Sequence, residues 1–348
     1  MLDMKRGILI IILVILGVVC CLQPCNAQQT GGYKSVSAGY WHIMVLKNDG
    51  SLWGWGANGT SQIGDGTNSD RSSAVKILDN VQSMSTGSSH TFAIKNDGTL
   101  WGWGWNSCGQ LGDGTTIDRN RPVMVLDNVC QVATGISYTL ALKNDGTLWG
   151  WGCNEYGQLG SQNSGSVPKK ILDDVKQVSA CEFHVFAIKS DGSLWGWGHN
   201  DYGQLGDGTK TDRTTPVKVM EDVRQVSVGD GFTLAVKNDG SLWSWGSNVD
   251  GALGISGCFE KSLPAKVLDG VRNVSAGEHH AMAIKNDGSL WSWGNNANGQ
   301  LGDGIMNPVR WEPIKIADRV KDVAAGGTIT IYLTEDGELM FCGKIGPK

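Results

Sequence analysis

A ten-residue motif recurs along the chain and limits what it can fold into. The first copy spans Lys47 to Gly56 and reads KNDGSLWGWG. Close copies begin at Lys95, Lys143, Lys189, Lys237 and Lys285, and a more divergent seventh copy runs from Thr334 to Gly343. The copies are about 48 residues apart, and a repeat of this length indicates one closed or stacked array of similar units rather than two unrelated domains.

Each unit contains the same series of short strand-like segments. An apolar, β-branched segment ends in glycine, and an alternating segment such as His90 to Ile94 follows it. The Asn-Asp-Gly turn then leads into Leu-Trp-x-Trp-Gly, and Asp-Gly between two alternating segments is a strong hairpin signal because both residues tolerate positive φ. A glycine-rich loop, complete at Asn106 to Thr115 and at Asn200 to Thr209, leads to a last segment that often begins with proline, as an edge strand can.

Four short strands per unit, without helical periodicity, are typical of a propeller blade. We therefore predict an all-β chain that forms a seven-bladed β-propeller of four-stranded blades. How the ring closes stays open, because the last segment of the unit occurs only six times, beginning at Ala74, Pro122, Val167, Pro216, Pro264 and Pro313. Either residues 28–33 supply the missing outer strand, although they do not match its pattern, or one blade has three strands.

The N-terminal residues do not belong to the array and have the features of an export signal. Two basic residues precede an apolar run at positions 8–19, which is short for a membrane span, and small residues precede a cleavage site after Ala27. We predict a signal peptide at residues 1–27, a propeller at residues 28–348 and a secreted or cell-surface protein. An uncleaved membrane anchor and a lipidated cysteine are the alternatives.

The charge of the chain argues against nucleic-acid binding. The formal net charge is −5, and it becomes −6 without the predicted signal peptide, which carries two basic residues and one acidic residue. Nucleic-acid binding needs clustered lysine and arginine to neutralise phosphates, and the rest of the sequence contains no basic run. We expect a protein partner, no nucleic acid, a monomeric chain, and membrane contact only if the N-terminal segment is uncleaved or lipidated.

Six cysteines lie outside the predicted signal peptide: Cys108, Cys130, Cys153, Cys181, Cys258 and Cys342. Export permits disulfides. These cysteines fall at different positions of the repeat and form no CxxC pair, which indicates neither a regular disulfide framework nor a zinc site. Two interpretations remain, namely isolated substitutions of small residues, or bridges between neighbouring repeats such as Cys108 to Cys153 or Cys130 to Cys181.

Three linked submotifs, Gly-x-x-His, Asp-Gly-x-Leu-Trp-x-Trp-Gly and Asn-x-x-Gly-Gln-Leu-Gly, occur in register in most copies. In this combination the chain resembles the regulator of chromosome condensation repeat family over about residues 33–343. The resemblance implies a seven-bladed β-propeller that serves mostly as a platform for partner proteins. The nucleotide exchange and chromatin binding of the family's namesake are not expected for an acidic chain with an export signal. A nearer precedent is a secreted bacterial member that inhibits β-lactamases with one propeller face.

Twelve of the fifteen tryptophans form pairs in the repeated Leu-Trp-x-Trp-Gly segment. Residues i and i+2 of a strand share a face, and a buried aromatic side chain removes roughly 150–250 Å² from water. We therefore expect both members of each pair to pack between blades rather than to bind a ligand. On this interpretation, truncation of Trp149 to alanine leaves a large void.

Histidine occupies one position of the unit in most copies, whereas the others carry tyrosine, phenylalanine or isoleucine: His42, His90, His184 and His280 against Tyr138, Phe232 and Ile329. Apolar side chains would not replace metal ligands so freely, and we expect these histidines to form structural hydrogen bonds. The Asp-Gly turns lack the spaced carboxylates of a calcium loop, and no GxSxG, HExxH, P-loop or Ser/His/Asp grouping stands out. We predict no metal, cofactor or catalytic residue.

Positions that differ between copies while staying large or charged are the candidates for partner contact. Two sets stand out, one just before the histidine position and one around the loop asparagine. The first contains Tyr40, Trp41, Glu182, Phe183, Asp230, Glu278 and His279. The second contains Trp105, Glu155, Tyr156, His199, Asp201 and Tyr202. If they mark one binding surface, both sets will lie on the same face of the propeller.

These patterns favour an exported, non-enzymatic binding protein that presents one propeller face to a protein partner. Two alternatives stay open. One is an extracellular propeller enzyme, a lyase or a hydrolase, acting on a cell-wall or carbohydrate substrate, since propeller enzymes assemble their sites from separate blades and leave weak local signals. The other is a protein similar to the β-lactamase inhibitor.

Overall fold

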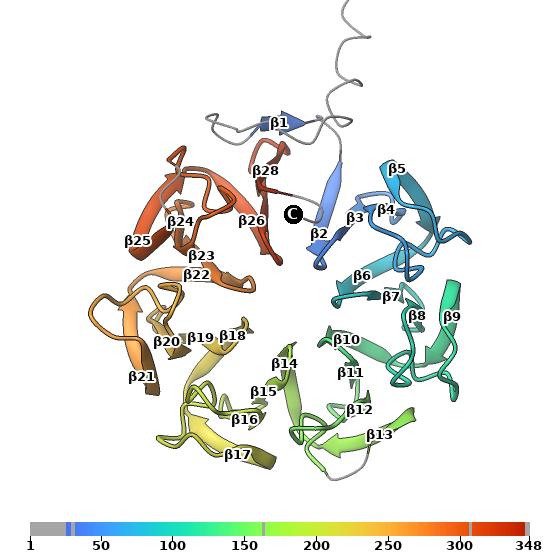
Figure 1. Ribbon diagram of the computed structural model, residues 1–348, viewed down its shortest axis with the longest axis horizontal. Coiled ribbons are helices and arrows are strands. Elements are labelled where there is room, and N and C mark those ends of the chain that lie inside the picture. The colour runs from blue at the N-terminus through green and yellow to red at the C-terminus, as the bar shows by residue number, and fades with distance from the viewer. Residues whose placement is uncertain (1–25, 29–31, 162–163, 306–307, 345–348) are drawn as a thin grey trace, which may run out of the picture.

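The strands form seven antiparallel sheets arranged as blades around a ring, and no helix occurs among the residues described (Figure 1). The computed structural model describes residues 26–28, 32–161, 164–305 and 308–344. Each sheet has four strands, and the first strand of each blade lies nearest the central axis while the fourth lies at the rim. The predicted all-β, seven-bladed β-propeller is therefore confirmed.

The bounds of the strands follow the repeat. Blade 1 contains β2 (Tyr33–Ala38), β3 (His42–Lys47), β4 (Leu52–Gly56) and β5 (Arg71–Leu78), and blade 2 contains β6 (Val81–Thr86), β7 (His90–Lys95), β8 (Leu100–Gly104) and β9 (Arg119–Leu126). Blade 3 contains β10 (Val129–Thr134), β11 (Tyr138–Lys143), β12 (Leu148–Gly152) and β13 (Gly165–Leu172), and blade 4 contains β14 (Val175–Cys181), β15 (His184–Lys189), β16 (Leu194–Gly198) and β17 (Arg213–Met220). Blade 5 contains β18 (Val223–Val228), β19 (Phe232–Lys237), β20 (Leu242–Ser247) and β21 (Glu260–Leu268), and blade 6 contains β22 (Val271–Ala276), β23 (His280–Lys285), β24 (Leu290–Asn295) and β25 (Val309–Ala317). Blade 7 contains β26 (Val320–Ala325), β27 (Ile329–Thr334), β28 (Leu339–Gly343) and β1 (Asn26–Gln28).

The Asn-Asp-Gly turn joins the second and third strands of a blade, as predicted. In blade 1, Asp49 accepts hydrogen bonds from the backbone N–H and the hydroxyl of Ser51, and Gly50 has a φ of 79°. A side chain at Gly50 would be strained at this φ, which explains the glycine. The turn sets the register in which Leu46 faces Leu52, and both side chains are fully buried.

The second tryptophan of each pair packs between two blades. Trp151 of β12 is fully buried, and its Nε1 donates a 2.8 Å hydrogen bond to the carbonyl of Gln110 in blade 2. Trp103, Trp197, Trp245 and Trp293 are equally buried and make the same bond to the preceding blade. The apolar core is accordingly divided into clusters that each join two neighbouring blades. The expected packing of the second tryptophan between blades is confirmed, and this residue is called the inner tryptophan below.

The first tryptophan of each pair also packs against a cluster that joins two blades, as expected, but it is only half-buried, as Trp149 and Trp195 show. Trp149 donates from Nε1 to the hydroxyl of Thr147, and the Lys143 ammonium lies 5.3 Å from its ring centroid. The cause is its place near the end of the strand, since Trp149 is the second residue of β12 and lies three residues after Gly146 of the hairpin turn. Trp55, the second tryptophan of blade 1, is the exception among the second tryptophans, because it is half-buried where it contacts Phe341 of blade 7.

The recurring histidines link neighbouring blades through buried hydrogen bonds. His42 Nε2 lies 2.9 Å from Thr91 Oγ1, and the Thr91 hydroxyl donates to the carbonyl of Gln62. Because threonine has one hydroxyl proton, His42 must be the donor through Nε2, which leaves its Nδ1 unprotonated and without a partner. Burial lowers the pKa of His42 to about 4 and keeps the ring neutral. The predicted structural hydrogen-bonding role is confirmed.

A matched substitution pattern runs around the ring. Wherever a blade has histidine, the next blade has threonine opposite it: His42 with Thr91, His90 with Thr139, His184 with Thr233 and His280 with Thr330. Wherever a blade lacks the histidine, the next blade has an apolar residue instead: Val185 after Tyr138, Ala281 after Phe232 and Ile43 after Ile329. The histidine and the threonine opposite it are therefore replaced together. At these interfaces a buried threonine hydroxyl occurs only where a histidine faces it.

The ring closes through β1, which pairs antiparallel with β28 so that Asn26 faces Phe341. Blade 7 thus has four strands, and the three-stranded alternative is wrong. The outer strand comes from residues 26–28 rather than from 28–33. Cleavage after Ala27 would remove two of its three residues, so the closing strand and the predicted signal peptide overlap.

The rest of the predicted signal peptide, residues 1–25, lies outside the described residues. Within the part of the chain that is described, there is no helix of the length and apolar character needed to cross a membrane.

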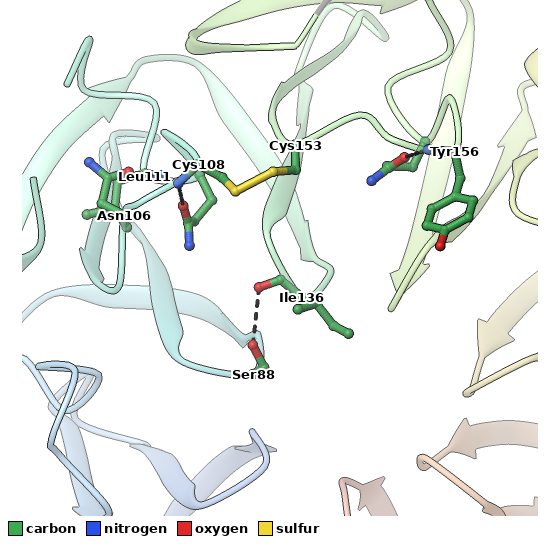
Figure 2. Close-up of a disulfide and its surroundings, with 9 residues drawn as sticks. Ser88, Asn106, Cys108, Leu111, Ile136, Cys153 and Tyr156 are labelled. Atoms are coloured by element: carbon green, nitrogen blue, oxygen red, sulfur yellow. Dashed lines mark hydrogen bonds between the residues drawn. A yellow bond between two sulfur atoms is a disulfide. The ribbon is translucent and has the colours of Figure 1, made fainter. Parts of the chain in front are cut away.

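One of the two proposed disulfides is present. Cys108, in the loop after β8, is bonded to Cys153, in the loop after β12, so the bridge joins blades 2 and 3 (Figure 2). The alternative pair is wrong, because Cys130 and Cys181 are both free thiols, as is Cys258. Cys342 is disulfide-bonded.

The two tryptophans of blade 3 provide a direct test of the packing. Trp151→Ala removes a fully buried indole and its hydrogen bond, and we expect it to lower the free energy of unfolding by about 3–5 kcal/mol. Trp149→Ala removes a half-buried indole and should cost clearly less. Chemical denaturation of both variants measures the difference, and equal losses would show that the two tryptophans are packed alike.

The matched pairs predict a rescue experiment with His184 and Thr233. Thr233→Ala alone leaves the buried His184 N–H without an acceptor, which costs about 1–3 kcal/mol. Adding His184→Phe recreates the Phe232 and Ala281 pair of the next blade interface and should recover much of this loss.

Burial lowers the pKa of His184 to about 3 in the folded chain, so its contribution to stability is present above pH 6.5 and is lost as the pH falls. The double variant should therefore lose about 1 kcal/mol less than the wild type between pH 6 and pH 5. Urea denaturation at the two pH values tests this prediction. Equal losses in both proteins would contradict a neutral, buried His184.

Candidate binding face

Two loops of each blade meet at the same end of the sheet. The loop between the first and second strands accepts a backbone hydrogen bond from the residue that begins the loop after the third strand. Examples are Ala57 to Trp41, Trp105 to Ser89, Cys153 to Ser137 and His199 to Phe183. The surface formed by these two kinds of loop is called the loop face below, and the hairpin turns lie at the opposite end of the blades.

Both sets of variable residues lie on the loop face. The first set is in the loops between the first and second strands, near the axis, and the second set is in the loops after the third strand, farther out. The condition stated from the sequence, that the two sets share one face, is met. Whether these residues bind a partner stays a prediction.

A central cavity of about 130 Å³ lies at the loop face, lined by the ends of the first strands, where most copies carry glycine. This cavity is called the channel below. A Cβ at Gly87 would lie 2.8 Å from the carbonyl oxygen of Gly135 in the next blade, so the close approach of the strands requires glycine there. Blade 4 has Cys181 instead, and burial raises the pKa of its thiol and keeps it protonated.

A hydrogen bond crosses the mouth of the channel from blade 1 to blade 4. The Tyr40 hydroxyl donates to Glu182 Oε1 at 2.6 Å, and burial together with Glu182 raises the pKa of the phenol. Burial and a hydrogen bond with Asp230 raise the pKa of Glu182 to about 7, and burial raises the pKa of Asp230 as well. The two carboxyl groups, from blades 4 and 5, therefore hold a proton more readily than exposed carboxylates do.

More carboxylates gather beside this bond. Asp230, Asp250 and Glu278 are 27–33% exposed, and burial raises the pKa of Asp230 and of Glu278. His279 lies among them, with Nδ1 3.5 Å from Asp250 and Nε2 3.8 Å from Asp230 and 3.7 Å from Glu278. Within the described residues, His279 is the only basic side chain that forms ion pairs with these three carboxylates. The carboxyl groups Glu182, Asp230, Asp250 and Glu278, with Tyr40, are called the mouth cluster.

Aromatic side chains lie next to the mouth cluster. The ring centroid of Tyr156 is 4.9 Å from that of Phe183 and 4.6 Å from that of His199, so the two variable sets contact each other directly. Tyr202 lies beside Gly231 and is 47% exposed. Tyr156, Phe183, His199 and Tyr202 are called the aromatic ledge. The Cys108–Cys153 disulfide holds the loop that leads to Tyr156 against blade 2 (Figure 2).

The structure gathers most but not all of the predicted residues. Tyr40, Glu182, Asp230, Glu278 and His279 meet at the mouth, and Asp201 lies beside the ledge, 3.1 Å from His199. The remaining predicted residues, Trp41, Trp105 and Glu155, occupy the same loops outside both groups.

Sequence reasoning missed Asp250. It stands two residues after the loop asparagine Asn248, at the position that carries Tyr156 and Tyr202 in other blades. Comparing the copies at that position would have found it.

Two groups of side chains have a spacing that would admit a metal ion, namely His199, Asp201 and Asp212, and Asp230, Glu278 and His279. Within each group the candidate ligand atoms lie within 4.8 Å of one another. Such spacing also arises in exposed acidic surfaces, and the expectation of no metal and no cofactor stays a prediction.

Comparisons with known proteins agree with this architecture. The structure is similar to that of human WBSCR16, with a TM-score of 0.78 and 24% identity over 91% of this chain and 88% of the other. It is also similar to Prp20p from Saccharomyces cerevisiae, with a TM-score of 0.76 and 23% identity over 90% of this chain and 83% of the other. At this identity the likeness shows the fold alone.

The sequence matches are consistent with the structures. A segment of 44 residues is 43% identical to the ultraviolet-B receptor UVR8 of Arabidopsis thaliana, and it covers 13% of this chain and 10% of that receptor. The family model described as RCC1-like domain matches residues 21–317, which is most of the chain. The protein therefore belongs to the family of RCC1-like domains.

Proposed function

We propose that this protein is an exported, non-enzymatic binding protein that presents its loop face to a protein partner. One observation carries the proposal: the large and charged residues that differ between copies fall on one face, whereas the hairpin turns of the other face repeat nearly unchanged. Aromatic side chains at the centre of a surface, with polar groups around them, are the usual anchors of a protein interface. Prp20p, of similar fold, is described as binding Gsp1p and histones.

Two features support export. The disulfide between Cys108 and Cys153 links loops that are 45 residues apart in the sequence. Disulfides of this kind persist in oxidising compartments and are rare in the reducing cytosol. The basic and apolar pattern of residues 1–27 has the order of a secretory signal. Because this segment overlaps β1, we propose that cleavage occurs upstream of Asn26, which would keep the closing strand.

The enzymatic alternative has one observation in its favour. Glu182, with a pKa of about 7 at the mouth of a channel, has the protonation that a general acid needs. Glu182, however, is already hydrogen-bonded to Asp230 and to the Tyr40 hydroxyl, so its carboxyl group is engaged within the protein. A protein similar to the β-lactamase inhibitor is a special case of the proposed function, since it also binds a protein with one face.

Affinity capture with variants of the full chain tests the proposal. The wild type should retain a protein from the extracellular fraction of its own source, and Tyr156→Ala with Phe183→Ala should lose it, because the ledge supplies the apolar anchor. Asn144→Ala, in a hairpin turn on the opposite face, is the control and should bind like the wild type.

Capture that survives the ledge substitutions but fails with the hairpin variant would assign binding to the other face. Turnover of a cell-wall glycan by the full chain, with no protein retained, would favour the enzyme.

A further inference from the structure

The loop face combines an aromatic ledge with a neighbouring group of carboxylates, and this combination indicates the chemistry of the partner. We propose that the partner inserts a basic side chain, an arginine or a lysine, into the mouth cluster while its flanking residues pack on the aromatic ledge. This inference rests on the proposed function and specifies the anchor by which the loop face holds its partner.

The first argument is unbalanced charge. Four partly buried carboxylates in the loops after the third strands are each paired with an arginine: Asp65 with Arg71, Asp113 with Arg119, Asp207 with Arg213, and Asp303 with Arg310. Several exposed turn carboxylates pair with a lysine three residues earlier, as Asp173 does with Lys170. In the mouth cluster, four carboxyl groups from blades 4, 5 and 6 face a single imidazole.

The second argument is partial burial. The carboxylates of the mouth cluster lie where water is limited, and burial raises the pKa of Glu182, Asp230 and Glu278. Desolvated carboxylates form stronger charge-assisted hydrogen bonds than fully hydrated ones. A cation supplied by a partner would relieve their mutual repulsion, and arginine can donate to two carboxylates at once.

The third argument is the position of the aromatic ledge beside the mouth cluster. Phe183 follows Glu182 directly in the chain, and its ring packs on Tyr156. An arginine or lysine bound at Glu182 would therefore lie beside the ledge, where the aromatic faces can hold its methylene stem and its charge. The mouth cluster and the ledge together suit an extended basic segment, because the ledge lies to one side of the mouth, over blades 3 and 4.

Peptide binding to the full chain measures the preference for a basic side chain. The probe is a fluorescein-labelled peptide of glycine and serine with three arginines, and its control replaces arginine by citrulline, which keeps the shape of the side chain but not its charge. We expect the arginine peptide to bind roughly tenfold more tightly by fluorescence anisotropy, and the difference to shrink with added salt. Equal binding of the two peptides would overturn the proposal.

Neutral variants locate the site. Glu182→Gln, Asp230→Asn and Glu278→Gln should each weaken binding of the arginine peptide by roughly fivefold or more. Glutamine at position 182 can still accept from Tyr40 and donate to Asp230, so that variant should fold normally. Glu221→Gln removes the same charge at the opposite end of the blades, away from the loop face, and should leave binding unchanged. An equal loss with Glu221→Gln would show diffuse attraction and overturn the proposal.

A divalent cation is the competing occupant. If calcium or zinc alone binds the wild type stoichiometrically, if it displaces the arginine peptide, and if Asp230→Asn abolishes its binding, the mouth is a metal site and the proposal is wrong. Peptide binding that is unaffected by either ion at equal concentration supports the proposal.

The pH dependence gives an independent readout. Glu182 is faced by Tyr40, Asp230 and Glu278, with Cys181 behind it and His279 nearby, and its pKa is about 7. Protonation removes the charge that attracts the cation, so binding of the arginine peptide should weaken as the pH falls from 8 to 6. In Glu182→Gln this dependence should flatten, and an unchanged pH profile in that variant would contradict the assignment.

Failure of this inference differs from failure of the proposed function. If the native partner is lost with the ledge variants but retained by Glu182→Gln and Asp230→Asn, the loop face binds and the basic anchor is wrong. If the native partner is retained by the ledge variants as well, the proposed function itself fails.

Discussion

The contact between neighbouring blades is the interaction on which the rest of the structure depends. At a typical interface, a buried histidine donates to a threonine of the next blade, that threonine donates to a loop carbonyl, and the inner tryptophan donates to the same carbonyl, as His90, Thr139, Gln110 and Trp151 do. These bonds fix the distance between blades, and the tryptophan fills the space that remains. Repeated around the ring, the same geometry brings the glycine-ended strands together at the axis and aligns the loops on one face.

The candidate site arises where this repetition stops. Blades 4, 5 and 6 carry Glu182, Asp230 and Glu278 where blades 2, 3 and 7 carry Ser88, Ile136 and Gly327, and blade 1 contributes Tyr40 across the channel. Placing partly buried carboxylates beside one another opposes folding rather than supporting it. An arrangement that costs stability, on a face whose neighbouring positions also vary, is better explained by binding than by architecture.

Much of this arrangement could be predicted from the sequence, because the residues that form the framework recur at the same positions of most repeats. The turn at Asp49 and Gly50, the inner tryptophans and the structural role of His42 were all predictable. The partial burial of Trp149 was not predictable, because periodicity shows which face of a strand a side chain is on but not how deeply it is buried between blades. The closing strand at residues 26–28 matches no other copy, and Asp250 joins the mouth only because distant loops converge. The bond between Tyr40 and Glu182 joins residues three blades apart, which no local pattern encodes.

Hydrogen exchange of the full chain, measured with and without the protein that it captures from its own source, tests the central claim most directly. The account predicts slower exchange in the inner loops of the loop face, at residues 39–41, 181–183, 229–231 and 277–279, with the hairpin turns unchanged. Slower exchange at the hairpin turns, such as residues 96–98 and 144–146, with no change in the inner loops, would contradict it.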